Sequence, residues 1–383
     1  MAAEPSLLRK RLLLVTYYPP ERGTGGGLRL LDMYRLLSQE VPGLSLTLLA
    51  CDHGAGLESD LSSIFERVMT LPPEQFNEGG LHATGLLEER FDAVDLQFLQ
   101  AGDLVRLFKR CGFPRVVVSP MESHVRGAAL ALARQQVPFV PTKRWLLGEL
   151  RVAVRELRAV WSADRVMCVS ESDARSLRKL RFWGGVIPIE TGVSAVEFGE
   201  ALRSLPVRLL KEAPTVTFLA YFGSQTNIEA LNWYLEYVHP AIKVAVPGYR
   251  FRVVGRGLSH LPASADASVD LVGEVDSLVG ELCHAWVGIA PALSGAGMRG
   301  KINQYAIVGV PCVASTLAGK GFAYKDGHSI RLAENATEFS RACIDLLASI
   351  EYNRKVGLVA RQVCLREYSW ESRLPALREI FAL

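Results

Sequence analysis

Short apolar runs alternate with amphipathic stretches along the whole chain. In the first half, apolar runs long enough for one strand each occupy residues 11–16, 44–50, 91–98, 115–119, 162–170 and 186–192. Helical patterns separate these runs, as at 143–158, where Leu147, Leu150 and Val154 recur on one side. Strands that alternate with helices predict a doubly wound α/β domain on a parallel sheet. In such sheets, ligands bind beyond the carboxyl ends of the strands.

The second half repeats this strand–helix pattern as an independent sheet. Its apolar runs occupy residues 215–221, 249–257, 269–274, 285–290 and 310–315. The stretch 193–214 between the halves has no strand-like core and contains Pro206 and Pro214, which predicts a domain junction. We therefore expect two doubly wound, Rossmann-like domains, an N-terminal one at 1–195 and a C-terminal one at 210–365. Two such domains facing each other across a cleft would bind a ligand there.

The stretch 291–315 combines turn, charge and helix signals. Glycines at 295, 297 and 300 let the backbone turn tightly after the preceding strand and approach a ligand closely. Arg299 and Lys301 stand where this loop becomes a helix, which we expect to run from about 301 to 308. Amide groups at a helix N-terminus and two neighbouring cations favour an anion such as a phosphate. The alternative is an ordinary strand–loop–helix connection in which the glycines serve only the turn.

Two places in the first half could also contribute to a ligand-binding site. Residues 23–27 form a glycine-rich loop between the first strand, which two prolines end, and a helix that begins near Leu28. This loop could hold an anion or let a sugar approach closely, and the alternative is a flexible lip between the domains. Glu122 and His124 follow the strand at 115–119, where catalytic or acceptor-contacting groups are expected. For His124 the alternative is a structural role.

Composition and charge narrow the class of protein. The chain has 383 residues, of which 49% are hydrophobic and 22% charged, as expected of a soluble globular protein with two domains. A net charge of +3 is too small to indicate nucleic-acid binding, but it allows a locally positive groove. The seven cysteines lack metal-ligand spacing, which indicates reduced thiols and argues against zinc. Without a signal-peptide core or a membrane span, we expect a cytoplasmic protein.

The predicted helix at 143–158 is strongly basic. It carries five cations and two apolar anchors near its start: Lys143, Arg144, Arg151, Arg155, Arg158, Trp145 and Leu146. Such a helix could touch an anionic membrane surface or a lipid-linked acceptor, which would place the protein peripherally at the inner face of the membrane. The alternative is a solvated helix face whose leucines pack inward.

Several short motifs follow one another along the chain. They are Tyr18-Pro-Pro with Gly25-Gly-Gly, Ser162 to Glu171, Gly223 to Ala230, Val254-Gly-Arg-Gly257, Val272-Gly-Glu-Val275, Gly297-Met-Arg-Gly-Lys301, Val308 to Ala314 and Tyr368-Ser-Trp-Glu371. Their order and spacing resemble those of the retaining GT-B glycosyltransferases of group 1, a family 4-like group, over nearly the whole chain. The resemblance implies the GT-B fold, in which a final helix, here 366–383, crosses back onto the N-terminal domain.

The resemblance also implies a reaction. A sugar would move from a nucleotide-sugar donor, bound mainly by the C-terminal domain, to a glycan, lipid-linked or protein acceptor bound by the N-terminal one, with retention of configuration. Negative charge develops on the leaving phosphate, where Arg299 and Lys301 would counter it. We therefore expect no metal, for which the sequence has no obvious aspartate cluster, and no cofactor besides the nucleotide-sugar co-substrate.

Carried over residue by residue, the resemblance implies a site. Its catalytic set would be Arg299, Lys301 and His124, the last in the place of the family's sugar-contacting histidine. The donor-binding residues would be Gly25, Gly26, Gly27, Gly223, Ser224, Gly273, Val275, Ser294, Gly295, Gly297, Met298 and Gln304. Among these, Gly273 and Val275 would lie near the nucleobase.

The chain departs from the family pattern in its acidic and basic residues. Gln304 stands where the family has a glutamate that grips the ribose hydroxyls, and Ala296 replaces an earlier acid. Residues 221–227 contain no Arg or Lys where the family has a basic pair. These departures favour a second hypothesis, a catalytically silent glycosyltransferase-like binding or partner subunit. A sugar-nucleotide epimerase or a nicotinamide-dependent oxidoreductase has less support, because neither a distinct acid–base set nor the dinucleotide fingerprint is present.

Overall fold

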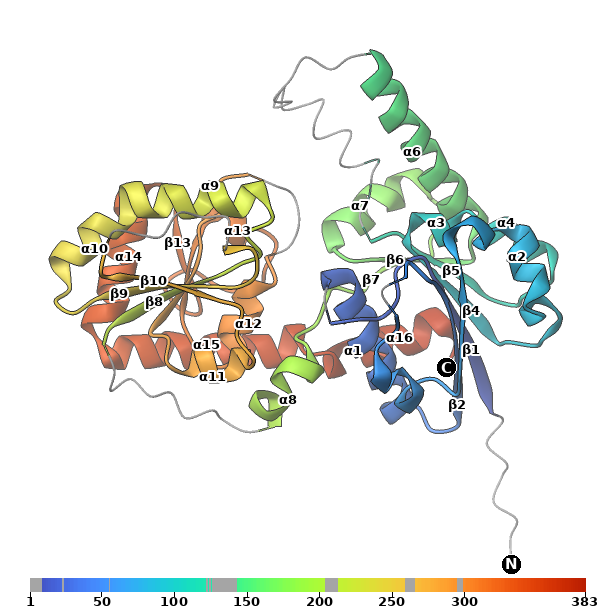
Figure 1. Ribbon diagram of the computed structural model, residues 1–383, viewed down its shortest axis with the longest axis horizontal. Helices are drawn as coiled ribbons and strands as arrows, with labels where there is room; N and C mark the ends of the chain where they lie inside the picture. The colour runs from blue at the N-terminus through green and yellow to red at the C-terminus, as the bar shows by residue number, and fades with distance from the viewer. Residues whose placement is uncertain are drawn as a thin grey trace, which may run out of the picture. The chain divides into compact units, whose positions relative to one another are not determined.

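The protein consists of two compact units, each with its own parallel sheet covered by helices (Figure 1). Its computed structural model describes residues 9–383 apart from 23, 55, 122, 124, 126–142, 204–212, 259–265 and 295–298. Unit 1 comprises Met1–Gly192 and Arg373–Leu383, and unit 2 comprises Val193–Ser372. Two doubly wound parallel sheets confirm the predicted fold class.

Unit 1 contains a seven-stranded sheet in the order β3-β2-β1-β4-β5-β6-β7. Its strands are β1 (Lys10–Thr16), β2 (Leu44–Cys51), β3 (Arg67–Leu71), β4 (Ala93–Gln97), β5 (Val116–Ser119), β6 (Arg165–Cys168) and β7 (Val186–Pro188). Its helices are α1 (Gly25–Glu40), α2 (Glu78–Ala83), α3 (Phe98–Gly102), α4 (Val105–Arg110), α6 (Lys143–Ser162), α7 (Glu171–Leu180) and α16 (Leu374–Phe381). The central strands are almost wholly buried, because helices cover both faces of a parallel sheet.

The strand pattern of unit 1 differs from the sequence expectation in β3, which was not predicted, and in β4, β6 and β7, which are shorter than the runs at 91–98, 162–170 and 186–192. The edge strand β3 was not predicted, because most of its residues are partly or fully exposed and form no apolar run. The predicted strand at 91–98 is shorter than expected, since β4 ends at Gln97 and Phe98 begins α3. Phe98 has a φ of 68°, a left-handed conformation that is unusual for a bulky residue. The chain therefore turns sharply at the carboxyl end of β4.

Unit 2 contains a six-stranded parallel sheet in the order β10-β9-β8-β11-β12-β13. Its strands are β8 (Thr215–Leu219), β9 (Arg250–Val254), β10 (Val269–Gly273), β11 (Val287–Ala290), β12 (Cys312–Ser315) and β13 (Arg331–Ala333). Its helices are α8 (Ala195–Arg203), α9 (Gln225–Trp233), α10 (His239–Ala245), α11 (Leu278–Cys283), α12 (Lys301–Ile307), α13 (Thr316–Gly319), α14 (Ala336–Ala348) and α15 (Ile350–Tyr368). The order places β8 beside β11, so their carboxyl ends meet at one edge.

Helix α12 is fixed to the sheet by Tyr305, which is completely buried. The Tyr305 hydroxyl accepts a hydrogen bond from the Leu219 backbone N–H at 2.8 Å. It also lies 3.1 Å from the Thr217 carbonyl oxygen, to which it donates. At Gly288 of β11 any Cβ would approach the Tyr305 ring to 2.3 Å, so only glycine fits under the ring. These contacts set the position of the first turn of α12.

The boundaries of the two units differ from the expected junctions. The stretch 193–214 was expected to be a linker, but its first part forms α8, and Phe198 and Ala201 of that helix are buried in the core of unit 2. At the C-terminus, α15 and the residues after it as far as Ser372 belong to unit 2, so the return to unit 1 begins at Arg373 rather than 366. Helix α16 then packs in unit 1, where the Arg115 guanidinium donates to the Ile380 carbonyl at 3.2 Å.

Candidate functional site

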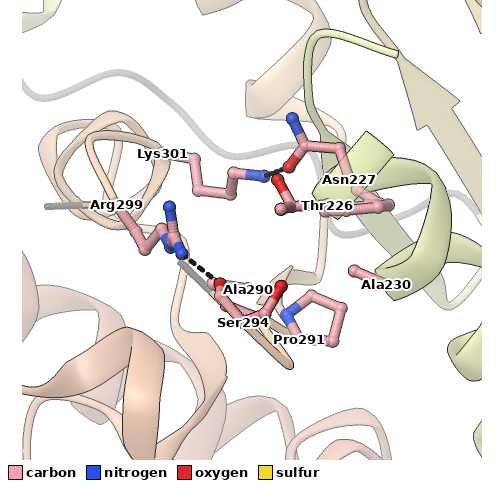
Figure 2. A pocket seen from close by; sticks show the side chains of 10 residues that line it. Thr226, Asn227, Ala230, Ala290, Pro291, Ser294, Arg299 and Lys301 are labelled. Atoms are coloured by element: carbon pink, nitrogen blue, oxygen red, sulfur yellow. Dashed lines mark hydrogen bonds between the residues drawn. The ribbon is translucent and has the colours of Figure 1, made fainter. Parts of the chain in front are cut away.

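The loop that follows β11 and the start of α12 bring two cations to the carboxyl edge of the unit 2 sheet. Arg299 and Lys301 both line a small pocket there (Figure 2). The other lining residues come from β8, α9, the end of β11 and the loop that follows β11, namely Phe218, Thr226, Asn227, Ala230, Ala290, Pro291, Ala292 and Ser294. The pocket is small, about 10 Å³, so it holds little more than one water and a larger ligand would extend beyond it.

Lys301 is held by two groups from other elements. Its Nζ lies 3.4 Å from Asn227 Oδ1 and 4.5 Å from the centroid of the Phe218 ring. Figure 2 shows the Lys301 side chain extended toward Asn227. Burial, followed by the nearby Arg299 guanidinium, lowers the pKa of Lys301 to about 7. The amine is therefore poised to change its charge near neutral pH.

Arg299 is oriented by the loop that precedes it. Its Nη2 donates to the Ser294 carbonyl oxygen at 2.6 Å (Figure 2). Burial lowers the pKa of Arg299, which nevertheless stays far above neutrality because a guanidinium is so basic. The structure thus brings together three of the predicted residues, Ser294, Arg299 and Lys301. The predicted loop residues Gly295, Gly297 and Met298, and also Ala296, lie outside the described residues.

A second wall of the pocket comes from β8 and the first part of α9, which a short connection joins. The predicted residues Gly223 and Ser224 lie in this connection, beside the pocket but not among its lining residues. Asn227 Nδ2 donates to the Tyr221 carbonyl oxygen at 2.8 Å, which leaves Oδ1 directed at Lys301. Asn227 and Thr226 were missed as site residues, although a polar first helical turn after a buried strand was a usable signal. Phe218, an apolar residue inside a strand, gave no such signal.

Three further predicted donor residues lie in unit 2 but do not line the pocket of Lys301. Gly273 ends β10 with a φ of 84°, where its carbonyl oxygen accepts from the Gly255 N–H at 2.7 Å. Val275 is partly buried against the core. Gln304 lies one turn into α12, and its side chain forms a hydrogen bond with Glu197 of α8. Burial raises the pKa of Glu197, and this hydrogen bond partly opposes the increase.

The glycines of unit 1 occupy a different structural position from the one expected. Gly25, Gly26 and Gly27 form the first turn of α1 instead of a loop before it, because the Thr24 side chain caps the helix by accepting from the Gly27 N–H at 3.1 Å. A Cβ at Gly27 would approach Glu21 Cγ to 2.5 Å, so the close packing requires glycine there. The predicted His124, like Glu122, lies outside the described residues.

The described part of the chain holds neither a cluster of metal ligands nor a disulfide. Among these residues, no group of three or more His, Cys, Asp or Glu side chains could hold a metal ion. The seven cysteines, all of them described, are free thiols, and most are buried.

Part of unit 2 is similar to a known family. A family described as Glycosyl transferases group 1 matches residues 213–349, which include the whole pocket of Arg299 and Lys301. Comparison with the sequences of characterised proteins finds no match.

Solved structures resemble the whole chain in fold. HepE from Anabaena, solved in complex with UDP and glucose, is 13% identical, with 97% of this chain and 99% of that chain covered and a TM-score of 0.67. The sucrose-phosphate synthase of Thermosynechococcus elongatus is 18% identical, with 98% and 100% covered and a TM-score of 0.67. The catalytic domain of starch synthase IV from Arabidopsis thaliana, bound to ADP and acarbose, is 11% identical, with 97% and 98% covered and a TM-score of 0.63. At these identities the similarity establishes the fold.

Proposed function

We infer that this chain, a group 1 glycosyltransferase with the GT-B fold, moves a sugar with retention of configuration from a nucleotide-sugar donor to a glycan, lipid-linked or protein acceptor. The observation that carries the inference is the pair of cations, Arg299 and Lys301, at one pocket on the carboxyl edge of a parallel sheet. Ligands bind at this edge in such folds. The solved relatives with UDP or ADP bound support a nucleotide donor.

The two cations suit the charge changes of sugar transfer. Breaking the bond between the anomeric carbon and the diphosphate leaves negative charge on the leaving phosphate and positive charge on the sugar. Arg299 is held in place by the Ser294 carbonyl, so its side chain need not move when the bond to the diphosphate breaks. Lys301 becomes cationic when an anion lies beside it, because an opposite charge favours the protonated form. We therefore propose transfer without a metal ion and without a cofactor besides the nucleotide sugar.

The role of Arg299 can be tested by calorimetry with UDP and ADP. Arg299→Ala should weaken nucleoside diphosphate binding by about 1–3 kcal/mol, the scale of a hydrogen bond to a charged group. Arg366→Ala is the matched control, because that side chain is exposed, forms an ion pair with its neighbour Glu367 and does not line the pocket. Unchanged affinity in Arg299→Ala would remove this residue from the donor site.

Turnover separates the enzyme from the alternative, a catalytically silent binding or partner subunit. We expect hydrolysis or transfer from at least one member of a panel of nucleotide sugars, with equal rates in the presence and absence of EDTA. His124→Ala should then lower turnover while leaving nucleotide affinity unchanged, in keeping with its proposed contact to the sugar. Nucleotide binding without any turnover across the panel would favour the silent subunit, for which Gln304 is the main sequence argument.

A contact with the membrane surface is a further part of the proposal. None of the helices in the described part of the chain has the length and apolar character to span a bilayer. Unit 1 nevertheless exposes three large aromatic side chains close together: Phe182 is 88% exposed, Trp183 52% and Trp161 51%. The Trp161 indole donates to the Leu180 carbonyl at 3.1 Å, and the Phe182 and Trp183 ring centroids are 5.2 Å apart.

These aromatic side chains lie among basic residues, which suits an anionic surface. The guanidinium of Arg181 lies 5.5 Å from the centroid of the Trp183 ring and donates to the Ala163 carbonyl, so the turn that carries the aromatics is held in place. Arg158, Arg175 and Lys179 are exposed on the adjoining helices α6 and α7. Aromatic anchors with cations are typical of proteins that bind the membrane interface.

Vesicle sedimentation can test this contact. The protein should sediment with vesicles of phosphatidylglycerol and phosphatidylcholine at low salt, and Phe182→Ser with Trp183→Ser should abolish the sedimentation. Tyr237→Ser, which changes an exposed aromatic residue of unit 2, is the control. Equal sedimentation of the double variant and the wild type would contradict the assignment of the surface.

A further inference from the structure

A second cavity lies in unit 1, at the carboxyl ends of β1 and β2. It measures about 210 Å³. The two strands are parallel neighbours, with Thr16 of β1 opposite Ala50 of β2, so the segments that follow them leave the sheet side by side. The cavity is lined by residues 18, 19 and 21 of the first segment and by residues 51–53, 56 and 57 of the second. The cavity therefore occupies the kind of position where parallel sheets bind ligands.

One side of the cavity is aromatic. The rings of Tyr18 and His53 are stacked, with centroids 5.4 Å apart and an interplanar angle of 23°. Tyr17 packs edge-on against His53 at 5.0 Å, and Phe98 packs edge-on against Tyr18 at 4.9 Å. Tyr18 is still 43% exposed, although its neighbours hold it firmly. A rigid ring that keeps an accessible surface is a suitable platform for the apolar face of a ligand.

The polar groups of the cavity are hydrogen-bond acceptors. The carboxylates of Glu21 and Asp52 both line it. Asp52 Oδ1 accepts from the Gly54 N–H at 2.7 Å, which leaves Oδ2 for a ligand. His53 Nε2 lies 2.8 Å from the Tyr17 carbonyl oxygen, to which it donates, so this nitrogen is not open to a ligand. A ligand that fits must bring hydroxyl donors, and the two carboxylates repel phosphate.

We propose that this cavity binds one neutral pyranose ring of a carbohydrate acceptor, a proposal that rests on the glycosyltransferase function. A pyranose combines an apolar C–H face, which stacks on Tyr18, with a rim of hydroxyl groups, which donate to Glu21 and Asp52. The charge of this cavity is opposite to that of the pocket of Arg299 and Lys301 in unit 2. Each unit thus offers a site for a different substrate, the anionic donor in unit 2 and a neutral sugar in unit 1. The acceptor class is a glycan or a glycolipid sugar, not a bare protein side chain.

Saturation-transfer-difference NMR on the full chain tests the proposal. The probes are methyl α-D-glucopyranoside, methyl α-D-mannopyranoside and methyl β-D-galactopyranoside. At least one should show transfer to its ring protons, and Tyr18→Ala and Asp52→Asn should each weaken its binding about tenfold. Tyr237→Ala, the loss of an exposed tyrosine in unit 2, should leave the binding unchanged. Inorganic phosphate should not compete with the glycoside.

The outcomes distinguish this proposal from the proposed function. UDP and ADP titrations of the same samples report on the donor site, and circular dichroism reports on the fold of each variant. The sugar site alone is overturned if nucleotides bind normally but the glycosides give no signal. The same conclusion follows if the glycoside signal does not depend on Tyr18 or is displaced by phosphate. Loss of the glycoside signal in Asp52→Asn with an intact fold supports the site, because that substitution keeps the size of the side chain. Failure of every nucleotide to bind or react overturns the glycosyltransferase function itself.

Discussion

The binding of a nucleotide sugar is expected to take up a proton at pH 8, and Lys301 is the group that accepts it. Burial, followed by the neighbouring Arg299, lowers the pKa of Lys301 to about 7, whereas an exposed lysine has a pKa of about 10.4. At about pH 8, roughly one tenth of the free protein therefore carries the ammonium form. A bound diphosphate favours the charged form and restores a pKa near the ordinary value. Binding should then take up about 0.9 proton per donor.

The affinity for the donor should follow the same titration. Between about pH 6 and pH 8 the ammonium fraction of free Lys301 falls from about nine tenths to about one tenth, so affinity should fall about tenfold, or ~1.4 kcal/mol. The folding stability has its own pH dependence. The folded-state pKa lies below the unfolded value, so the folded protein binds fewer protons between about pH 7 and 10, and the contribution of Lys301 to stability rises with pH across that window.

Calorimetric titrations with UDP-glucose and ADP-glucose in HEPES and Tris buffers measure the proton uptake, because these buffers differ in ionisation enthalpy and neither supplies a competing phosphate. Lys301→Arg is the informative variant, since its permanent charge should bind the donor without proton uptake and flatten the pH dependence. Lys320→Arg, at an exposed position in the same unit, is the control. A proton uptake near zero in the wild type at pH 8, or an equal uptake in Lys301→Arg, would refute the reasoning.

Three other substitutions test polar interactions inside the two units. Tyr305→Phe should lower the free energy of unfolding by about 1–3 kcal/mol, because the buried Leu219 N–H loses its acceptor; urea unfolding with no loss would contradict this. Burial raises the pKa of Asp95 to about 6, so the folded state keeps a proton that the unfolded state releases, and stability should fall from about pH 4 to 6. Asp95→Asn should remove that slope in urea titrations, and an unchanged slope would show that another group causes it. Gln304→Glu should place a second carboxyl group beside Glu197 and lower the melting temperature more at pH 8 than at pH 5. Donor binding should remain, and complete loss of nucleotide binding would be inconsistent with this arrangement.

The hydrophobic pattern was sufficient for the fold because the central strands are buried on both faces. The runs 11–16, 44–50 and 215–221 correspond closely to β1, β2 and β8. The edge strands β3 and β13 escaped prediction because their partly exposed residues produce no continuous apolar run. Helix α8 was missed for a related reason, since two prolines further along the same stretch suggested a linker throughout.

Only those residues of the candidate site that lie close together in the sequence could be predicted. Arg299 and Lys301 were found because a glycine loop and a helix start flank them in the sequence. Asn227 and Phe218 lie more than seventy positions earlier in the sequence, and they reach Lys301 only because β8 and β11 are neighbours in the sheet. The order of strands follows from tertiary packing and is not encoded in any local motif.

Gln304, the departure that most favoured a catalytically silent protein, has a partner in the structure. Its side chain forms a hydrogen bond with Glu197 of α8, and burial raises the pKa of that carboxyl. A glutamate at 304 would bring two carboxyl groups together in a partly buried place, where both cannot ionise cheaply. A glutamine instead donates a hydrogen bond to the carboxylate. The family has an acid at this position of α12. Here that acid is missing, and Glu197 supplies a carboxyl group beside the same position from another segment. Because the Glu197 carboxyl group remains beside position 304, the glutamine at 304 is weaker evidence for a catalytically silent protein than it would be if no carboxyl group lay nearby.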